Sequence, residues 1–167
     1  MASAPAAEAG ADATARAQAE DRGVLGGGTA PPPQPPAPPT AADAFNAARA
    51  LYASGAAARA ADAFQDFVTR YPTNPRAPEA YYWLGESYYA QHGYQNAIAA
   101  YASALRSRPT TAWAAAAMVR LADSLQRENQ STQACAALSE YDQRYAARAA
   151  APVRASAAAV RKRARCE

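Results

Sequence analysis

The sequence predicts an all-α protein in which three consecutive helix pairs form a solenoid and a further helix caps its C-terminal end. Three observations lead to this prediction. The chain of 167 residues is rich in alanine, which favours helix and lets helices pack closely. Its aromatic residues all fall between Phe45 and Tyr145, so the material for a core is concentrated there. Similar residues also recur every 37 positions, as at Ala60, Ala97 and Ala134.

The same period relates further apolar positions, namely Phe64, Tyr101 and Leu138, and also Leu51, Tyr88 and Leu125. A repeat of this length is typical of solenoids built from stacked supersecondary units. The three copies are expected at residues 41–74, 78–111 and 115–146. Their helices are expected near residues 42–54, 57–70, 78–91, 94–107, 112–128 and 131–145.

The middle copy resembles a tetratricopeptide repeat, which implies a right-handed solenoid. The positions that carry the resemblance are Leu84, Gly85, Tyr88, Ala97, Tyr101, Ala104 and Pro109. Each has a physical reason: Gly85 and Ala97 let the two helices approach closely, the tyrosines fill the space between them, and Pro109 ends the second helix. The first copy is in register with this pattern, and the third is less regular, as expected of a terminal repeat.

The first forty residues differ from the rest in composition. They pass from an Ala-rich polar stretch through three glycines at residues 26–28 to a proline-rich run at residues 31–39. Glycine gives flexibility and consecutive prolines favour extended polyproline II, so residues 1–40 are expected to be a disordered Ala/Pro-rich spacer. A ligand for an SH3-like domain is the alternative, but no flanking arginine sets an orientation for it. Thr40 and Asp43 then have the spacing of a capping box, which predicts the start of the first helix.

The C-terminal segment predicts one more helix. Pro152 suits the first turn of a helix, and helix-forming residues follow it, so a capping helix is expected near residues 151–165. Residues 144–167 carry seven Lys or Arg against the single acid Glu167. These cations would complement the C-terminal end of a helix and keep an end cap soluble. The alternative is that the run around Arg161 and Lys162 attracts nucleic acid or anionic lipid.

The two cysteines, Cys135 and Cys166, fall on segments that we expect to run antiparallel. At about 1.5 Å per residue, about ten residues along the last repeat helix and about fifteen back along the cap bring them within a turn or two of each other. A disulfide there would fasten the cap to the array and indicate an oxidising compartment. Two free thiols, one buried and one at the terminus, are the alternative.

Residues able to carry catalysis are scarce. His92 is the only histidine, and it falls in a turn of the middle copy with no cysteine near it in the sequence. No GxGxxG or GxxxxGKS/T loop occurs, so nothing predicts a nucleotide site. The sequence predicts a protein that is not an enzyme and has no cofactor, metal site or bound nucleic acid. Membrane insertion is not expected either, because no stretch of about 18 apolar residues occurs.

In a tetratricopeptide array, the first helix of each pair lines a concave surface, and its residues one turn apart face a ligand. Those positions are Phe45, Arg49 and Tyr52 in the first copy, Tyr82, Glu86 and Tyr89 in the second, and Val119, Asp123 and Gln126 in the third. Tyr and Arg are common interface anchors, so this aromatic strip of mixed charge predicts a groove for an extended or helical peptide. Some of the tyrosines are expected to pack between repeats instead.

Two segments carry a more specific resemblance. The first includes Phe45-Asn46, Ala60, Phe64-Gln65, Phe67 and Arg70-Tyr71-Pro72, and the second includes residues 82–89, Ala97-Ile98 and Tyr101. With the 37-residue spacing, the proline-rich linker and the late pair of cysteines, these segments resemble the C-terminal tetratricopeptide domain of the CpoB family, also called YbgF. The alphaproteobacterial members are the most similar. The resemblance covers residues 41–166.

This resemblance implies a periplasmic protein of the Tol-Pal system that binds TolA. It implies coordination of septal peptidoglycan synthesis, by a bifunctional penicillin-binding synthase, with outer-membrane constriction during cell division. Members usually begin with a signal peptide and a short trimerising coiled coil, and the sequence shows neither. An oligomer is therefore expected only if such a coiled coil precedes it.

Two alternatives to this function stay open. An outer-membrane assembly lipoprotein of the BamD type has similar repeats, but it would need about five of them and a lipobox cysteine. A general peptide-binding module whose basic tail binds an anionic surface is the second alternative. A steep fall of affinity with salt would indicate the second, because contacts to phosphate groups depend strongly on salt.

Overall fold

The computed structural model describes residues 39–107 and 109–166. Within these residues the regular secondary structure is all helical and includes no strand. The helices are α1 (Ala41–Ala53), α2 (Ala57–Arg70), α3 (Ala77–Ala90), α4 (Tyr94–Leu105), α5 (Ala112–Arg127), α6 (Ser131–Arg144), a short 3-10 helix (Ala146–Arg148) and α7 (Ala151–Ala164). The α-helices begin and end within about two residues of the predicted ones. The predicted linker, residues 1–40, lies outside the described residues except for its last two.

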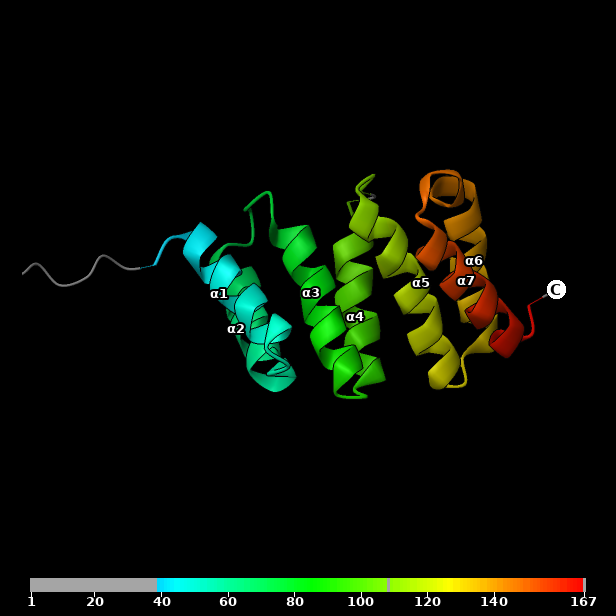
Figure 1. Ribbon diagram of the computed structural model, residues 1–167, viewed down its shortest axis with the longest axis horizontal. Helices are drawn as coiled ribbons and strands as arrows, with labels where there is room; N and C mark the ends of the chain where they lie inside the picture. The colour runs from blue at the N-terminus through cyan, green and yellow to red at the C-terminus, as the bar shows by residue number, and fades with distance from the viewer. Residues whose placement is uncertain (1–38, 108, 167) are drawn as a thin grey trace, which may run out of the picture. The chain divides into compact units, whose positions relative to one another are not determined.

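The α-helices form two layers. In the first layer α1 contacts α3, α3 contacts α5, and α5 contacts α7, and we call the surface of these four helices the A-helix face. Each of α2, α4 and α6 packs against two members of that layer. Figure 1 shows the helices side by side in chain order, from α1 at one end to α6 and α7 at the other. The predicted all-α solenoid of three helix pairs with a capping helix is confirmed.

Residues that recur every 37 positions form the contacts inside each pair. Three equivalent alanines are fully buried: Ala60, Ala97 and Ala134. Their small side chains let the second helix of each pair approach the first, and this close packing buries them. Gly85 of α3 lies against Tyr101 of α4, where an added Cβ atom would lie 2.5 Å from Cε1 of the tyrosine ring. The expectation that Gly85 and Ala97 permit close packing is therefore confirmed.

A residue in the left-handed conformation follows the first helix of every pair. Gly55, His92 and Asn129 have φ angles of 79°, 61° and 60°, and successive members are 37 residues apart. This backbone conformation lets the chain turn into the second helix, and glycine and asparagine adopt it at low cost. His92 has a Cβ atom that crowds the backbone in this conformation, and it lacks the short side chain through which asparagine compensates by local hydrogen bonds. Its exposed position in a turn agrees with the sequence prediction.

Both ends of the domain are capped as expected. The Thr40 hydroxyl accepts a 3.2 Å hydrogen bond from the Asp43 amide, and the Asp43 carboxylate accepts one of 3.0 Å from the Thr40 amide. At the other end, Pro152 lies in the first turn of α7. The buried side chains of Ala157 and Val160 face α5 and α6, against which α7 packs. The capping box and the capping helix are both confirmed.

Candidate functional site

A hollow of about 390 Å³ opens on the A-helix face between α3, α5 and α7. Its volume falls in the range of about 300–1,000 Å³ that ligand pockets usually have. The apolar part of its lining includes Val119 of α5 and Val153, Ala159 and Val160 of α7. Charged and other polar side chains of all three helices form much of the rest.

Glu86 of α3 is one of two buried carboxylates in the wall of this hollow, and its side chain is 7% exposed. Its Oε1 atom accepts a 2.6 Å hydrogen bond from the Tyr101 hydroxyl of α4 and lies 3.1 Å from Nε of Arg120 on α5. Burial raises the pKa of Tyr101, and the negative charge of Glu86 raises it further. The hydroxyl therefore stays protonated and donates to Glu86, which joins three helices.

Asp123 of α5 is the second buried carboxylate, and its side chain is 6% exposed. It accepts hydrogen bonds from the Tyr89 hydroxyl of α3, from Arg127 Nε at 3.2 Å and from Arg163 Nη2 of α7 at 2.5 Å. Burial by itself would raise the pKa of Asp123, but the hydrogen bonds from Tyr89, Arg163 and Arg127 outweigh it and hold that pKa below its usual value. An ionised Asp123 thus joins α3, α5 and α7.

The two carboxylates occupy equivalent positions in successive repeats, since Glu86 and Asp123 are 37 residues apart. Tyr52 and Tyr89 are also 37 residues apart, and each meets the carboxylate of the next helix on the A-helix face. Tyr89 donates its hydroxyl proton to Asp123, and burial and Glu86 raise the pKa of Tyr52. The repeat therefore places a tyrosine and a carboxylate together where α1 meets α3 and again where α3 meets α5.

Three arginines are the accessible charged groups of the hollow. The side chains of Arg120, Arg127 and Arg163 are 42%, 42% and 47% exposed, in contrast to the carboxylates that they contact. Arg120 also lies over the ring of Tyr89, with 4.5 Å from its guanidinium carbon to the ring centre. A guanidinium has five N–H donors, so each arginine keeps donors for a further acceptor. The surface that a ligand would meet is therefore cationic.

Five residues predicted for the groove lie in this hollow: Tyr82, Glu86, Tyr89, Val119 and Asp123. Tyr82 is only 9% exposed, and its ring stacks on that of Trp113 with 5.8 Å between their centres. It therefore packs between repeats, as expected for some of these tyrosines. Arg49 and Tyr52 contact Trp83, and neither they nor Gln126 are among the residues that line the hollow.

Phe45 requires a correction. It was predicted to face the groove, but it is fully buried in the core of the first helix pair. Its ring meets those of Phe64 and Phe67 edge-on, with centres 5.7 and 5.5 Å away. The equivalent positions in the next repeats, Tyr82 and Val119, are also buried, so this register position points between helices.

Sequence reasoning missed Arg120, Arg127 and the contribution of α7. Arg120 follows Glu86 by 34 residues, and Asp123 follows Tyr89 by the same number. This shared spacing is the signal in the sequence that pairs Arg120 of α5 with Glu86 of α3. Likewise, Val160 follows Asp123 by 37 residues, which aligns α7 with the first helix of a further repeat. The cap thus belongs to the A-helix face and forms one side of the hollow.

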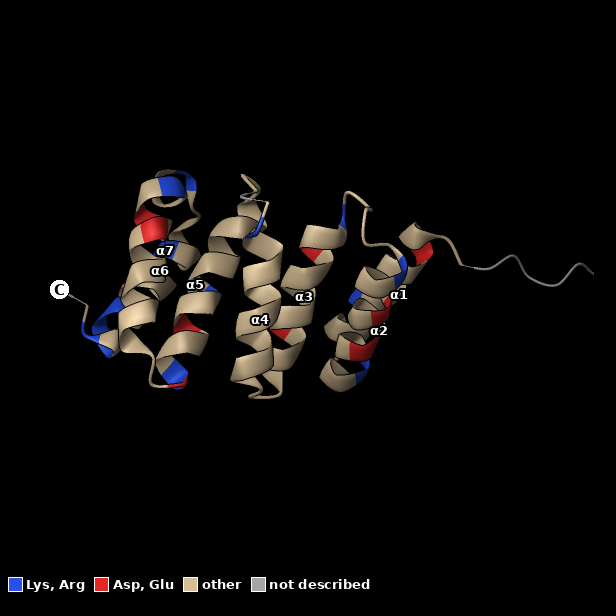
Figure 2. Cartoon of the chain, turned by 180° about the vertical axis from the view of Figure 1, so that it is seen from behind, with Lys and Arg blue, Asp and Glu red and all other residues tan. Residues whose placement is uncertain are grey.

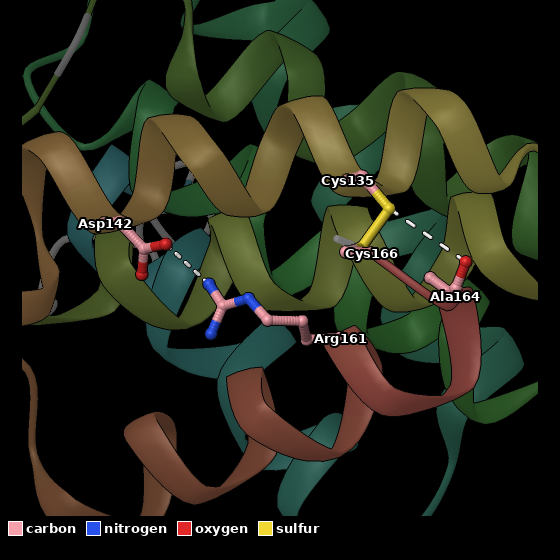
Figure 3. Close-up of a disulfide and its surroundings, with 5 residues drawn as sticks. All are labelled: Cys135, Asp142, Arg161, Ala164 and Cys166. Carbon is pink, nitrogen blue, oxygen red and sulfur yellow. Dashed lines mark hydrogen bonds and ion pairs between the residues drawn. A yellow bond between two sulfur atoms is a disulfide. The ribbon is translucent and has the colours of Figure 1, made fainter.

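A disulfide holds α7 in this position. Cys135 of α6 and Cys166 are bonded, with their Cα atoms 5.4 Å apart. Figure 3 shows this bond and, farther along the same two helices, the ion pair of Arg161 and Asp142 at 2.6 Å. The expected link between cap and array is therefore present, and it fixes the α7 side of the hollow.

The basic residues at the C-terminal end are partly used in attaching the cap. Figure 2 shows Lys and Arg along α7 and near the turn that joins α5 to α6. Two cations of the run that begins at Arg161 are paired, Arg161 with Asp142 and Arg163 with Asp123. This agrees with the expectation that the run completes the last turn of a capping helix.

The described residues offer little for catalysis. No group of three or more His, Cys, Asp or Glu side chains among them is placed to hold a metal ion. Nδ1 of His92 lies 2.9 Å from the Tyr94 hydroxyl in an exposed turn. None of the described helices is long and apolar enough to cross a bilayer.

Comparison with known families agrees with this architecture. Residues 45–112 match a tetratricopeptide repeat family, and residues 116–147 match a second one. The matches and the stacked helix pairs together show that the chain contains tetratricopeptide repeats, which form an all-α solenoid. No curated protein matches the chain. Domains of this type are in general scaffolds for protein–protein interaction and not enzymes, because their stacked repeats form an extended binding surface.

Proposed function

We propose that this protein is a periplasmic scaffold of the Tol-Pal system. In this proposal it binds TolA on the A-helix face and coordinates septal peptidoglycan synthesis with outer-membrane constriction during cell division. A bifunctional penicillin-binding synthase is the second partner. The observation that carries the proposal is a hollow with exposed arginines on a tetratricopeptide repeat domain whose sequence resembles the CpoB family.

The disulfide supports the proposed compartment. Stable disulfides form in oxidising environments, which include the bacterial periplasm, and are rare in the cytosol. Here the bond between Cys135 and Cys166 fastens a helix that forms one side of the hollow. In a reducing compartment this disulfide would be reduced and the helix would lose its covalent link. The proposed binding surface is therefore best suited to an oxidising compartment.

A steric block tests the proposed function. Ala159 is exposed on α7 and lines the hollow, whereas its neighbour Ala158 is exposed but does not line it. Ala159→Trp would fill the hollow without removing any of the contacts that hold the helices together. Ala158→Trp is the matched control, with the same change of size on the same helix.

The immobilised full-length chain is incubated with purified TolA and, separately, with periplasmic extract of an alphaproteobacterium. We expect TolA to be retained by the unchanged chain and by Ala158→Trp, and lost with Ala159→Trp. If the unchanged chain retains no TolA, the Tol-Pal assignment is wrong. If both tryptophan variants retain TolA equally, the partner is right but the hollow is not its site.

A further inference from the structure

We propose that the hollow between α3, α5 and α7 selects an acidic peptide segment. The carboxylates of the segment would bond to Arg120, Arg127 and Arg163, and a small apolar side chain beside them would enter the hollow. This inference rests on the proposed function only in that a protein binds to the A-helix face. It does not require that the protein be TolA.

The acidic groups of the hollow are already engaged by neighbouring side chains. Glu86 accepts from Tyr101 and pairs with Arg120, and Asp123 accepts from Tyr89 and from two arginines. Both carboxylates are nearly fully buried, with side chains 7% and 6% exposed. A basic segment would therefore find no accessible carboxylate here, although the sequence alone indicated a surface of mixed charge.

The cations of the hollow, in contrast, are accessible and pre-oriented. Arg120, Arg127 and Arg163 are each more than two-fifths exposed, and each is held in place by a buried carboxylate. A guanidinium that is already oriented loses little side-chain entropy when it binds a carboxylate with its remaining N–H groups. Three such groups around one hollow outnumber its two buried carboxylates, so the charge of the hollow is complementary to an acidic ligand.

The apolar lining of the hollow favours a peptide over other anions. Val153 is half-buried and Ala159 is exposed, and both line the hollow above the buried side chains of Val119 and Val160. A small side chain next to a carboxylate can use this surface, and a phosphate group cannot. A nucleic-acid duplex or a bilayer is also too wide to enter a hollow of about 390 Å³. The chemistry therefore indicates a segment in which acidic residues and a small apolar residue face the same side.

Fluorescence anisotropy with the full-length chain tests the proposal. Three labelled synthetic peptides share the same two valines and carry Asp, Asn or Lys at all of the remaining positions, so that a valine and the varied residues can face the same side. We expect the Asp peptide to bind about tenfold more tightly than the Asn peptide, because charged hydrogen bonds are stronger than neutral ones. The Lys peptide should bind more weakly than both. Equal affinity for the Asp and Asn peptides would overturn the proposal.

Charge-matched variants locate the binding. Arg163→Gln and Lys162→Gln each remove one cation from α7, but only Arg163 lines the hollow. Arg163→Gln should weaken the Asp peptide about tenfold, and Lys162→Gln should leave its affinity nearly unchanged. Arg163→Lys should fall between them, since lysine keeps the charge but not the fork of donors. Equal losses for the two Gln variants would mean that net charge alone attracts the peptide, which refutes the site.

Salt titration and two competing anionic ligands complete the test. If circular dichroism shows that Arg163→Gln is unfolded, the salt dependence of the unchanged chain tests the proposal instead. The affinity for the Asp peptide should fall as ionic strength rises, and the affinity for the Asn peptide should not. Vesicles with anionic phospholipid and a DNA duplex are also titrated. The proposal would be overturned if the vesicles or the DNA bound more tightly than the Asp peptide and if Arg163→Gln weakened that binding. If TolA is not captured but the Asp peptide still binds, only the proposed function fails.

Discussion

Removal of the disulfide should lower the stability of the domain substantially. The double substitution Cys135→Ser and Cys166→Ser breaks the bond with little change of side-chain volume. The cap would then be held by two ion pairs, Arg161 with Asp142 and Arg163 with Asp123, and by the apolar contacts of α7. We therefore expect the variant to keep its helices but to unfold at a lower denaturant concentration.

The magnitude follows from the length of the closed loop. The two cysteines are separated by 31 residues. In the chain-entropy model, a cross-link of this span removes about 12 cal/mol/K from the unfolded state, or about 3.7 kcal/mol at 25 °C. Since small domains are stable by only about 5–15 kcal/mol, this single bond is expected to account for a large share of the free energy of unfolding.

Equilibrium urea unfolding, followed by circular dichroism, measures the effect. The oxidised chain should be about 3–4 kcal/mol more stable than the double variant. A reductant should lower the stability of the unchanged chain to that of the variant and leave the variant unaffected. The predicted role of the bond is refuted if the oxidised chain and the variant unfold with the same free energy, or if the reductant destabilises both.

Three further predictions concern the repeats. Gly85→Ala should lower the free energy of unfolding by about 1–3 kcal/mol, because its Cβ would lie 2.5 Å from the buried ring of Tyr101; unchanged urea unfolding would contradict this. His92→Gly should raise the melting temperature, because glycine adopts the left-handed conformation without the cost of about 1 kcal/mol that a Cβ atom imposes. An unchanged or lower melting temperature would count against strain at this position. The lowered pKa of Asp123 means that its contribution to stability is complete above the ordinary value of 3.8 and is lost as the pH falls through the lower folded value. Thermal unfolding across the acid range should therefore show a smaller loss of stability for Asp123→Asn, and an equal loss would contradict the assignment.

The fold was largely predictable because it depends on regular spacing and local chemistry. The 37-residue period fixes which residues of successive helices are equivalent, and Gly85 and Ala97 indicate where two helices approach. Thr40 and Pro152 mark helix starts through short-range effects on the backbone. These signals act within one repeat, so they could be interpreted without knowing how the repeats stack.

The proposed binding surface was less predictable because it depends on contacts between repeats. Phe45 shares an inner helix side with Arg49, but only the packed structure shows that its position points into the core. Glu86 and Asp123 were identified as ligand-facing, whereas cations and hydroxyls from neighbouring helices engage them. The role of α7 depends on its docking against α5, which an alanine-rich sequence does not specify by itself.

The most direct test of the proposed binding surface is photo-cross-linking of the Asp peptide, with a benzophenone side chain at one valine position, to the full-length chain. Mass spectrometry of the digested product locates the bond. We predict cross-links in α3, α5 and α7, around the hollow on the A-helix face. The Ala159→Trp substitution should reduce them, and Ala158→Trp should not. Cross-links confined to α2, α4 and α6 would contradict the central claim that this face is the binding surface.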